Sequence, residues 1–152
     1  GKHMDINNLN RELSNEANKI LFDKGLMGVL SEFGETFITG SYYFDLMTWR
    51  DLDIYVRNND MKKEEFCLMG GKLAKILNPH KMNFRDEKLL KRGKPKGLYW
   101  GIYSDILETH TWKIDIYVVG NQEYEELING AKYLKKKMDK EIIDTILKIK
   151  YH

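Results

Sequence analysis

The chain has 152 residues, which is long enough for one domain with a real core and too short for two of average size. Its formal charge of +2 is close to balance, so the composition carries no nucleic-acid footprint, although it does not exclude nucleic acid either. No apolar run approaches the roughly 20 residues of a membrane span, and no secretory signal is present. The one cysteine, Cys67, cannot form an internal disulfide, which favours a cytoplasmic protein without membrane contact.

The N-terminal third is predicted to be helical and then to enter a strand. Residues 1–4 resemble an expression-tag remnant, so we expect one domain over residues 5–152. From Asn7 to Phe33, apolar residues recur at helical spacing and predict one or two helices that Gly25 ends or bends. Phe37–Thr39 follows as a short buried strand, because its residues are aromatic or β-branched.

The most informative stretch joins the pair Gly40-Ser41 to a strand that starts at Asp51, after nine intervening residues. Side chains at i and i+2 of a strand share a face, so Asp51 and Asp53 project together while Leu52 turns towards the core. Two adjacent carboxylates repel each other, and a magnesium ion would remove that cost. Gly40-Ser41 lies at a turn before a possible short helix and offers N–H groups and a hydroxyl to an anion. The stretch therefore predicts a phosphate-binding turn facing a metal site.

A third carboxylate lies on a later alternating strand, Trp112–Val119. Asp115 is on the polar face of this strand, beside Lys113 and Tyr117. If this strand lies next to the one that starts at Asp51, Asp115 joins the other two carboxylates around one or two metal ions. The alternative is a structural carboxylate that pairs with Lys113 or Arg50.

The segments between these strands are less specific. Asn58-Asn59-Asp60 predicts a turn and an N-cap for an amphipathic helix that Pro79 terminates, with Cys67 as a small core residue on it. His80–Arg85 is a weak strand candidate. Glu87–Lys96 is basic and loop-like, and we interpret it as a solvated connection, with a mobile arm that contacts substrate phosphate or an acidic partner as the alternative.

Leu98–Tyr103 predicts a further strand, in which Gly101 indicates close approach of a ligand or another backbone. Tyr99 and Tyr103 lie on the same face of this strand as Gly101, either as ordinary packing or as rings that stack on a nucleobase or acceptor. We interpret His110 as a turn residue rather than a catalytic base. From Asn121 to Ile149 the 3.6-residue period predicts a long surface helix with a basic, solvated side.

The glycine, serine and aspartates singled out above resemble the signature of the DNA polymerase beta-type nucleotidyltransferase superfamily. Within it, the chain length and the phrase Trp49-Arg50-Asp51 are similar to the small bacterial nucleotidyltransferase-domain proteins. The resemblance implies an α/β (α+β) fold, with a mixed β-sheet, helices packed mainly on one side and the acidic site on the open face. One departure is Asp45, which stands where many relatives carry a glycine and adds negative charge near the triphosphate.

By resemblance, the site residues have distinct roles. Asp51 and Asp53 would hold a nucleotide-bound Mg²⁺, with Mn²⁺ as a substitute, and Gly40-Ser41 would bind phosphate. Asp115 would help to hold a catalytic ion and would accept the proton of the attacking hydroxyl. The candidate substrate contacts are Tyr99, Tyr103 and Lys113.

The implied activity is transfer of a nucleoside monophosphate from an NTP to a hydroxyl, with Mg-dependent release of pyrophosphate. The acceptor would be a small molecule such as an antibiotic, or a protein side chain. It would bind across the cleft of a homodimer or between the sheet and the C-terminal helix. The alternative is a nucleotide-binding antitoxin or regulatory module with the same fold and little catalysis. A glycosyltransferase using Asp-x-Asp is a third idea, which would leave Gly40-Ser41 unexplained.

Overall fold

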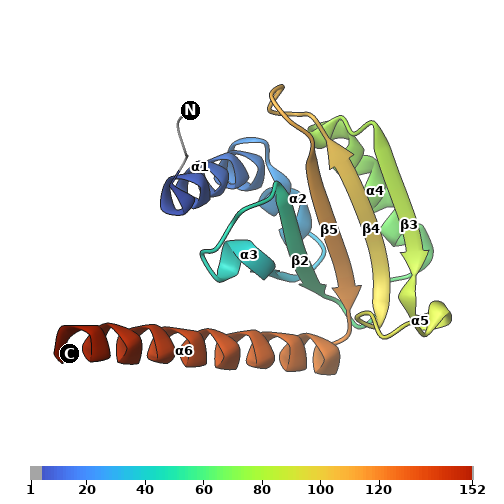
Figure 1. The fold of residues 1–152 in the computed structure, drawn as a ribbon. Coiled ribbons are helices and arrows are strands. Elements are labelled where there is room, and N and C mark those ends of the chain that lie inside the picture. Colours follow the sequence, from blue (N-terminus) through green and yellow to red (C-terminus); the bar gives the residue numbers. More distant parts are fainter. Residues whose placement is uncertain (1–4, 152) are drawn as a thin grey trace.

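The structure is a computed structural model that describes residues 5–151, with side chains described up to residue 149; the expected tag remnant, residues 1–4, lies outside this range. Five strands form one sheet in the order β1-β2-β5-β4-β3 (Figure 1). Strands β2 and β5 are parallel, and the other neighbouring pairs are antiparallel. The strand bounds are β1 Glu35–Thr39, β2 Asp51–Arg57, β3 Lys81–Asp86, β4 Gly97–Ser104 and β5 Trp112–Val119. The expected mixed α/β class with a mixed sheet is therefore confirmed.

The helices follow the expected order. Gly25 adopts a left-handed conformation with φ of 90° and separates the first helical region from α2, as its position in the sequence predicted. A short helix does follow β1 at Gly40, and a long helix ends the described chain. The bounds are α1 Ile6–Asn18, a π-helical segment Lys19–Asp23, α2 Leu26–Ser31, α3 Gly40–Tyr43, α4 Lys63–Leu77, α5 Glu87–Leu90 and α6 Asn121–Tyr151.

One face of the sheet carries the main core. Alternate residues of the central strands, such as Leu52 and Ile54 on β2 and Ile114 on β5, are fully buried against the first three helical segments and α4. In Figure 1, α2 and α4 lie behind the sheet on this face. The opposite face is covered near its lower end by the first turns of α6, where Tyr124 and Ile128 pack with sheet residues. The polar residues of the strands lie on this second face.

Helix α6 differs from the expectation of a surface helix packed along its apolar side. Figure 1 shows that it continues well past the sheet, beyond α3. Lys135 ties it to α3 by donating to the Tyr43 carbonyl at 3.0 Å. Beyond that point the helix is longer than the surface it crosses, and several of its apolar side chains are exposed: Ile142, Ile143, Ile146, Leu147 and Ile149. The apolar period predicted the helix correctly but not its covered length.

Two local predictions were wrong. Cys67 is on α4 as expected but is exposed, because Phe66 and Met69 supply the buried side of the helix at that point. The residue that caps α4 is Lys62 rather than Asp60, and its side chain makes no cap hydrogen bond. The asparagines before it are used elsewhere.

Those asparagines tie the loop after β2 to its neighbours. Asn58 donates through Nδ2 to the Phe33 carbonyl at 2.8 Å, and the Asn59 Oδ1 accepts from the backbone N–H of Asn121 at 2.8 Å. These bonds fix the loop against the ends of α2 and β5 and so make the side chains unavailable as caps. Turn chemistry was predicted correctly, and the cap assignment failed for this reason.

The basic segment after β3 is partly helical. Glu87, the first residue of α5, is buried, and its Oε1 accepts from Arg85 at 2.7 Å and Arg92 at 2.8 Å. These two arginines hold the pKa of Glu87 below its usual range by hydrogen bonding, despite burial.

Among the described residues, no helix is long and apolar enough to cross a membrane.

Candidate functional site

The expected adjacency of the two acidic strands is present. Asp53 on β2 lies directly opposite Asp115 on β5, and Asp51 lies opposite Lys113. Burial, followed by the charges of Asp115 and Asp51, raises the pKa of Asp53 to about 6, and a hydrogen bond with Asp115 acts in the same direction. Asp53 therefore retains its proton at mildly acidic pH, where an ordinary aspartate has lost it.

Asp115 is also held from the side of β4. The Tyr99 hydroxyl donates to its Oδ1, and the Lys113 Nζ lies 3.5 Å from the same oxygen. Burial and the Asp115 carboxylate raise the pKa of Tyr99, which keeps this phenol protonated as a donor. Of the two residues that we considered as structural partners of Asp115, Lys113 is therefore in place. Arg50 is not, because it makes a bidentate ion pair with Glu16 at 3.0 Å.

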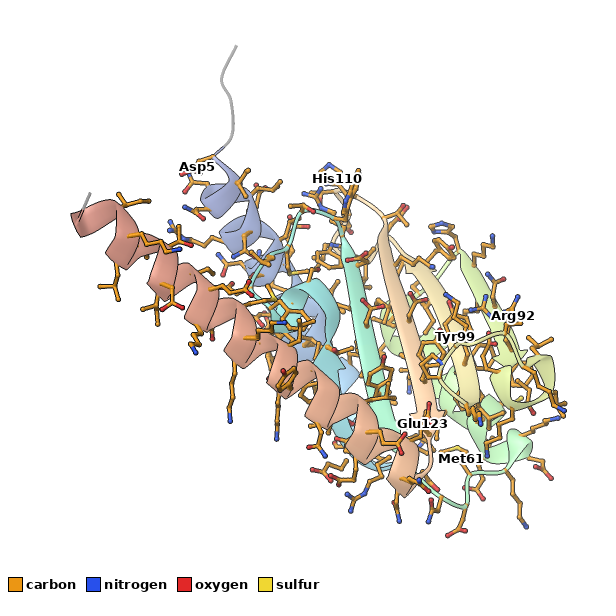
Figure 2. All side chains as sticks on the ribbon, turned by 60° about the horizontal axis from the view of Figure 1, so that its bottom comes forward. Asp5, Met61, Arg92, Tyr99, His110 and Glu123 are labelled. Atoms are coloured by element: carbon orange, nitrogen blue, oxygen red, sulfur yellow. The ribbon has the colours of Figure 1, made fainter. Side chains whose placement is uncertain are left out.

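Gly101 lies opposite Asp115 on β4 and makes the Tyr99 contact possible. A Cβ atom at Gly101 would overlap the Tyr99 hydroxyl. The close approach predicted for this glycine is therefore that of a side chain from the same strand. Figure 2 shows Tyr99 within the sheet, away from the end that carries His110.

Gly40 and Ser41 lie against the acidic pair from the side of β1. Thr39 is paired with Asp53, and a Cβ atom at Gly40 would overlap the Asp53 Oδ2. Gly40 has φ of 65°, a conformation that favours glycine. The Ser41 Oγ is buried and has no hydrogen-bond partner among the described residues. A buried hydroxyl without a partner is a costly feature that a ligand oxygen would relieve.

The two tyrosines proposed as substrate contacts have different surroundings. Tyr99 is buried, and the Arg85 guanidinium lies 3.8 Å from its ring centroid, so its ring is used within the protein. Tyr103 is partly exposed, with the ammonium groups of Lys81 at 5.1 Å and Lys113 at 5.8 Å from its ring centroid. Lys113 thus contacts both the acidic pair and Tyr103.

Asp45 adopts a left-handed backbone conformation with φ of 58°. A glycine would adopt this conformation without strain, whereas an aspartate does so less readily. The Asp45 side chain is exposed and accepts a hydrogen bond from the Asn10 Nδ2 at 2.8 Å. It is therefore bound to α1 by a neutral donor.

The sequence did not predict a pocket at the end of the sheet where β2 and β5 begin. It has a volume of about 560 Å³ and lies between the loop before β2 and the loop before β5. Its lining residues are Thr48, Trp49, Arg50, Asp51, His110, Thr111 and Lys113. Figure 2 shows His110 at the end of the sheet where β2 and β5 begin, opposite the end that carries Glu123. The only signal in the sequence was the tryptophan two residues before Asp51.

The donor set fits a hard cation only in part. Carboxylate oxygens are suitable ligands for Mg²⁺, and a cation would offset the burial and the neighbouring carboxylates that raise the pKa of Asp53. Among the described residues, however, no three His, Cys, Asp or Glu side chains converge as a ready-made metal site. A cation at this pair would depend on further oxygen ligands from a bound molecule.

The chain matches no protein-family model and no curated protein sequence.

Proposed function

We propose that the protein is a cytoplasmic, Mg-dependent nucleotidyltransferase of the DNA polymerase beta type. The observation that carries this proposal is the contact between Gly40 and the Asp53 carboxylate, with the unpartnered Ser41 hydroxyl beside it. A turn that can bind phosphate is thereby packed against a carboxylate pair whose only nearby cation among the described residues is the Lys113 ammonium, 3.5 Å from Asp115. Phosphoryl transfer requires both features in one place.

The site residues would have three roles: binding the cation, binding phosphate and accepting a proton. Asp51 and Asp53 would hold the cation together with the NTP phosphates, and Gly40-Ser41 would bind phosphate oxygens through backbone N–H groups and the Ser41 hydroxyl. When bound, the cation would supply charge stabilisation at the reacting phosphate and polarise the attacking hydroxyl. Asp115 would accept the proton of that hydroxyl, and Tyr99, which donates to its Oδ1, would hold the carboxylate in place.

The proposed transfer is a single displacement at the α-phosphorus of the NTP. The acceptor hydroxyl oxygen bonds to the α-phosphorus, and the bond from that phosphorus to the oxygen bridging to the β-phosphate breaks. Pyrophosphate leaves with the bond's electron pair, and the proton passes to Asp115. The acceptor is a small molecule such as an antibiotic, or a protein side chain, bound across the cleft of a homodimer or between the sheet and the C-terminal helix.

The alternative function is a nucleotide-binding antitoxin or regulatory module that keeps this site with little catalysis. One observation favours it: Lys113 occupies a position 3.5 Å from Asp115 and neutralises part of the charge that catalysis would use. The enzyme remains the better-supported function because all three aspartates are present and Asp53 lies opposite Asp115 in the paired strands.

A transfer assay with NTPs labelled at the α-phosphate tests the proposal. The purified chain is incubated with Mg²⁺ and each NTP against a panel of hydroxylated antibiotics and against cell extract. We expect label on an acceptor, with equimolar pyrophosphate, and loss of both in Asp115→Asn. Mg-dependent NTP binding without transfer to any acceptor, in the presence of a bound protein partner, would instead support the regulatory module.

A further inference from the structure

The pocket beside Asp51 combines an exposed tryptophan with a rigid support. Trp49 is 77% exposed, although the residues around it are firmly held. Met47 is fully buried, and its N–H donates to the Asn10 Oδ1 at 2.8 Å. Arg50 is fixed by Glu16, which also accepts from the indole of the buried Trp112 at 3.1 Å. The loop thus presents one large aromatic ring to solvent at little conformational cost to a ligand.

The backbone of this loop is joined to the acidic strands as well. The Lys113 N–H donates to the Arg50 carbonyl at 3.0 Å, which extends the pairing of β2 and β5 up to the pocket. Asp51 and Lys113 line the pocket and lie opposite each other in the two strands. The pocket is therefore the direct continuation of the acidic face, on the side away from the core.

The position of the phosphate-binding turn decides which ligand group reaches the pocket. Gly40 contacts Asp53, so the phosphates of an NTP held there would lie beside the second acidic residue of β2. Asp51 lies two residues nearer the strand's start on the same face and borders the pocket. A molecule that extends from Asp53 past Asp51 enters the pocket and reaches Trp49.

We propose that this pocket binds a flat ring stacked on Trp49, and that the ring is the nucleobase of the NTP. This inference rests on the proposed function. Aromatic side chains stack on any base, because each base has a π-face. Thr48, Thr111 and His110 line the same pocket and offer hydroxyl and imidazole groups to the edge of a base. The volume of about 560 Å³ lies within the range of small-molecule sites.

The experiment compares MgATP with magnesium tripolyphosphate, which has the three phosphates and no base. Affinities are measured by calorimetry for the parent chain and for Trp49→Ala, Trp49→Phe and Leu46→Ala. Leu46 is an exposed apolar residue of the same loop and serves as the matched control. We expect MgATP to bind roughly tenfold or more tightly than tripolyphosphate, and Trp49→Ala to abolish that difference. Trp49→Phe should retain most of it, and Leu46→Ala all of it.

Tryptophan fluorescence gives a second readout. Trp112 is fully buried and Trp100 is partly buried, so quenching by MgATP should come from Trp49 and should vanish in Trp49→Phe. Melting temperatures of the variants should match the parent because Trp49 is exposed.

The outcomes separate this inference from the proposed function. If tripolyphosphate binds with Mg²⁺ in an Asp53-dependent manner, but the preference for MgATP is absent or survives Trp49→Ala, the nucleobase site is overturned and the phosphate site stands. If neither compound binds in the presence of Mg²⁺, the proposed function and this inference are both overturned. A Trp49-dependent preference for MgATP supports the inference.

Discussion

Asp53 and Asp115 lie opposite each other in the parallel strands β2 and β5, and burial together with the Asp115 carboxylate raises the pKa of Asp53. Such a pair binds a proton and a metal ion at the same place, so the two ligands compete. We therefore expect the site to bind a cation better as Asp53 loses its proton, whose pKa is raised to about 6.

Binding of Mn²⁺ without nucleotide, followed by the EPR signal of the free ion, tests this competition. Affinity should be weak, should rise by up to roughly tenfold per pH unit below about pH 6, and should level off above it. Asp53→Asn should abolish the binding, and the exposed turn residue Asp60 provides the matched control, Asp60→Asn. Affinity that is independent of pH from 5 to 7 would contradict the assignment.

The same carboxylate should cost the folded protein stability at neutral pH. Since the pKa of Asp53 is raised from 3.8 to about 6, the folded state binds more protons than the unfolded state within that window, and stability falls as pH rises through it. Asp53→Asn should therefore raise the free energy of unfolding at pH 7.5 by on the order of 1 kcal/mol after allowance for solvent screening, and the melting temperature should rise with it. At pH 4 the gain should be nearly absent. Thermal melts across this range decide the matter, and a destabilised Asp53→Asn protein at pH 7.5 would show that the carboxylate is structurally required.

Gly40 and Ser41 should respond differently to substitution by alanine. Gly40→Ala places a Cβ atom into the Asp53 carboxylate at φ of 65°, so we expect a loss of roughly 2 kcal/mol or more and weaker NTP binding. Ser41→Ala removes a hydroxyl without a partner, which should leave stability unchanged or improved while it weakens NTP binding by roughly tenfold.

Gly28 in α2 is the matched control for Gly40. A Cβ atom there meets nothing within 4 Å, so Gly28→Ala should stabilise the helix by up to about 1 kcal/mol. Urea denaturation measures all three variants. Gly40→Ala with parental stability and parental NTP affinity would place the phosphate site elsewhere.

Asp115 should act on the chemical step. In single-turnover transfer, Asp115→Asn should lose roughly 100-fold or more in rate while NTP affinity changes only a few-fold, because its proton transfer occurs mainly in the transition state. If Asp115 is instead a structural partner of Lys113, the variant should melt earlier and transfer at the parental rate in its folded fraction. That second pattern would refute the catalytic role.

Helix α6 offers two isoleucines in contrasting surroundings. Ile128 is 9% exposed and packs on the sheet, whereas Ile146 is 53% exposed beyond it. Ile128→Ala should cost about 2–4 kcal/mol, and Ile146→Ala less than about 0.5 kcal/mol. Equal losses from both would show that the outer part of the helix is covered in solution. Equilibrium unfolding of the two variants at low protein concentration measures the difference.

Strands with a clear alternation were predictable in detail. The predicted bounds of Trp112–Val119 coincide with β5, because four apolar side chains on one face must all be buried there. The common face of Asp51 and Asp53 also follows from a period of two. The position of Asp53 opposite Asp115 did not follow from the period, because it depends on the sheet order that places β5 beside β2.

What escaped prediction depends on residues brought together from distant segments. Tyr99 reaches Asp115 only because Gly101 leaves the space, and Trp49 and His110 meet at one pocket from two separate loops. Cys67 was misplaced because helix periodicity identifies a buried side less reliably at its margin. Local pattern therefore located the acidic residues, and tertiary contacts determined what surrounds them.

The parallel pairing of β2 and β5 has a further consequence for how the protein acquires its site. Helix α4 and strands β3 and β4 lie between these two strands in the chain, so Asp53 and Asp115 meet only through a contact of long sequence separation. A partly folded chain that lacks this pairing has no carboxylate pair to offer. Any ligand of the pair binds only the complete sheet, and it therefore stabilises the folded chain by an amount that rises with ligand concentration.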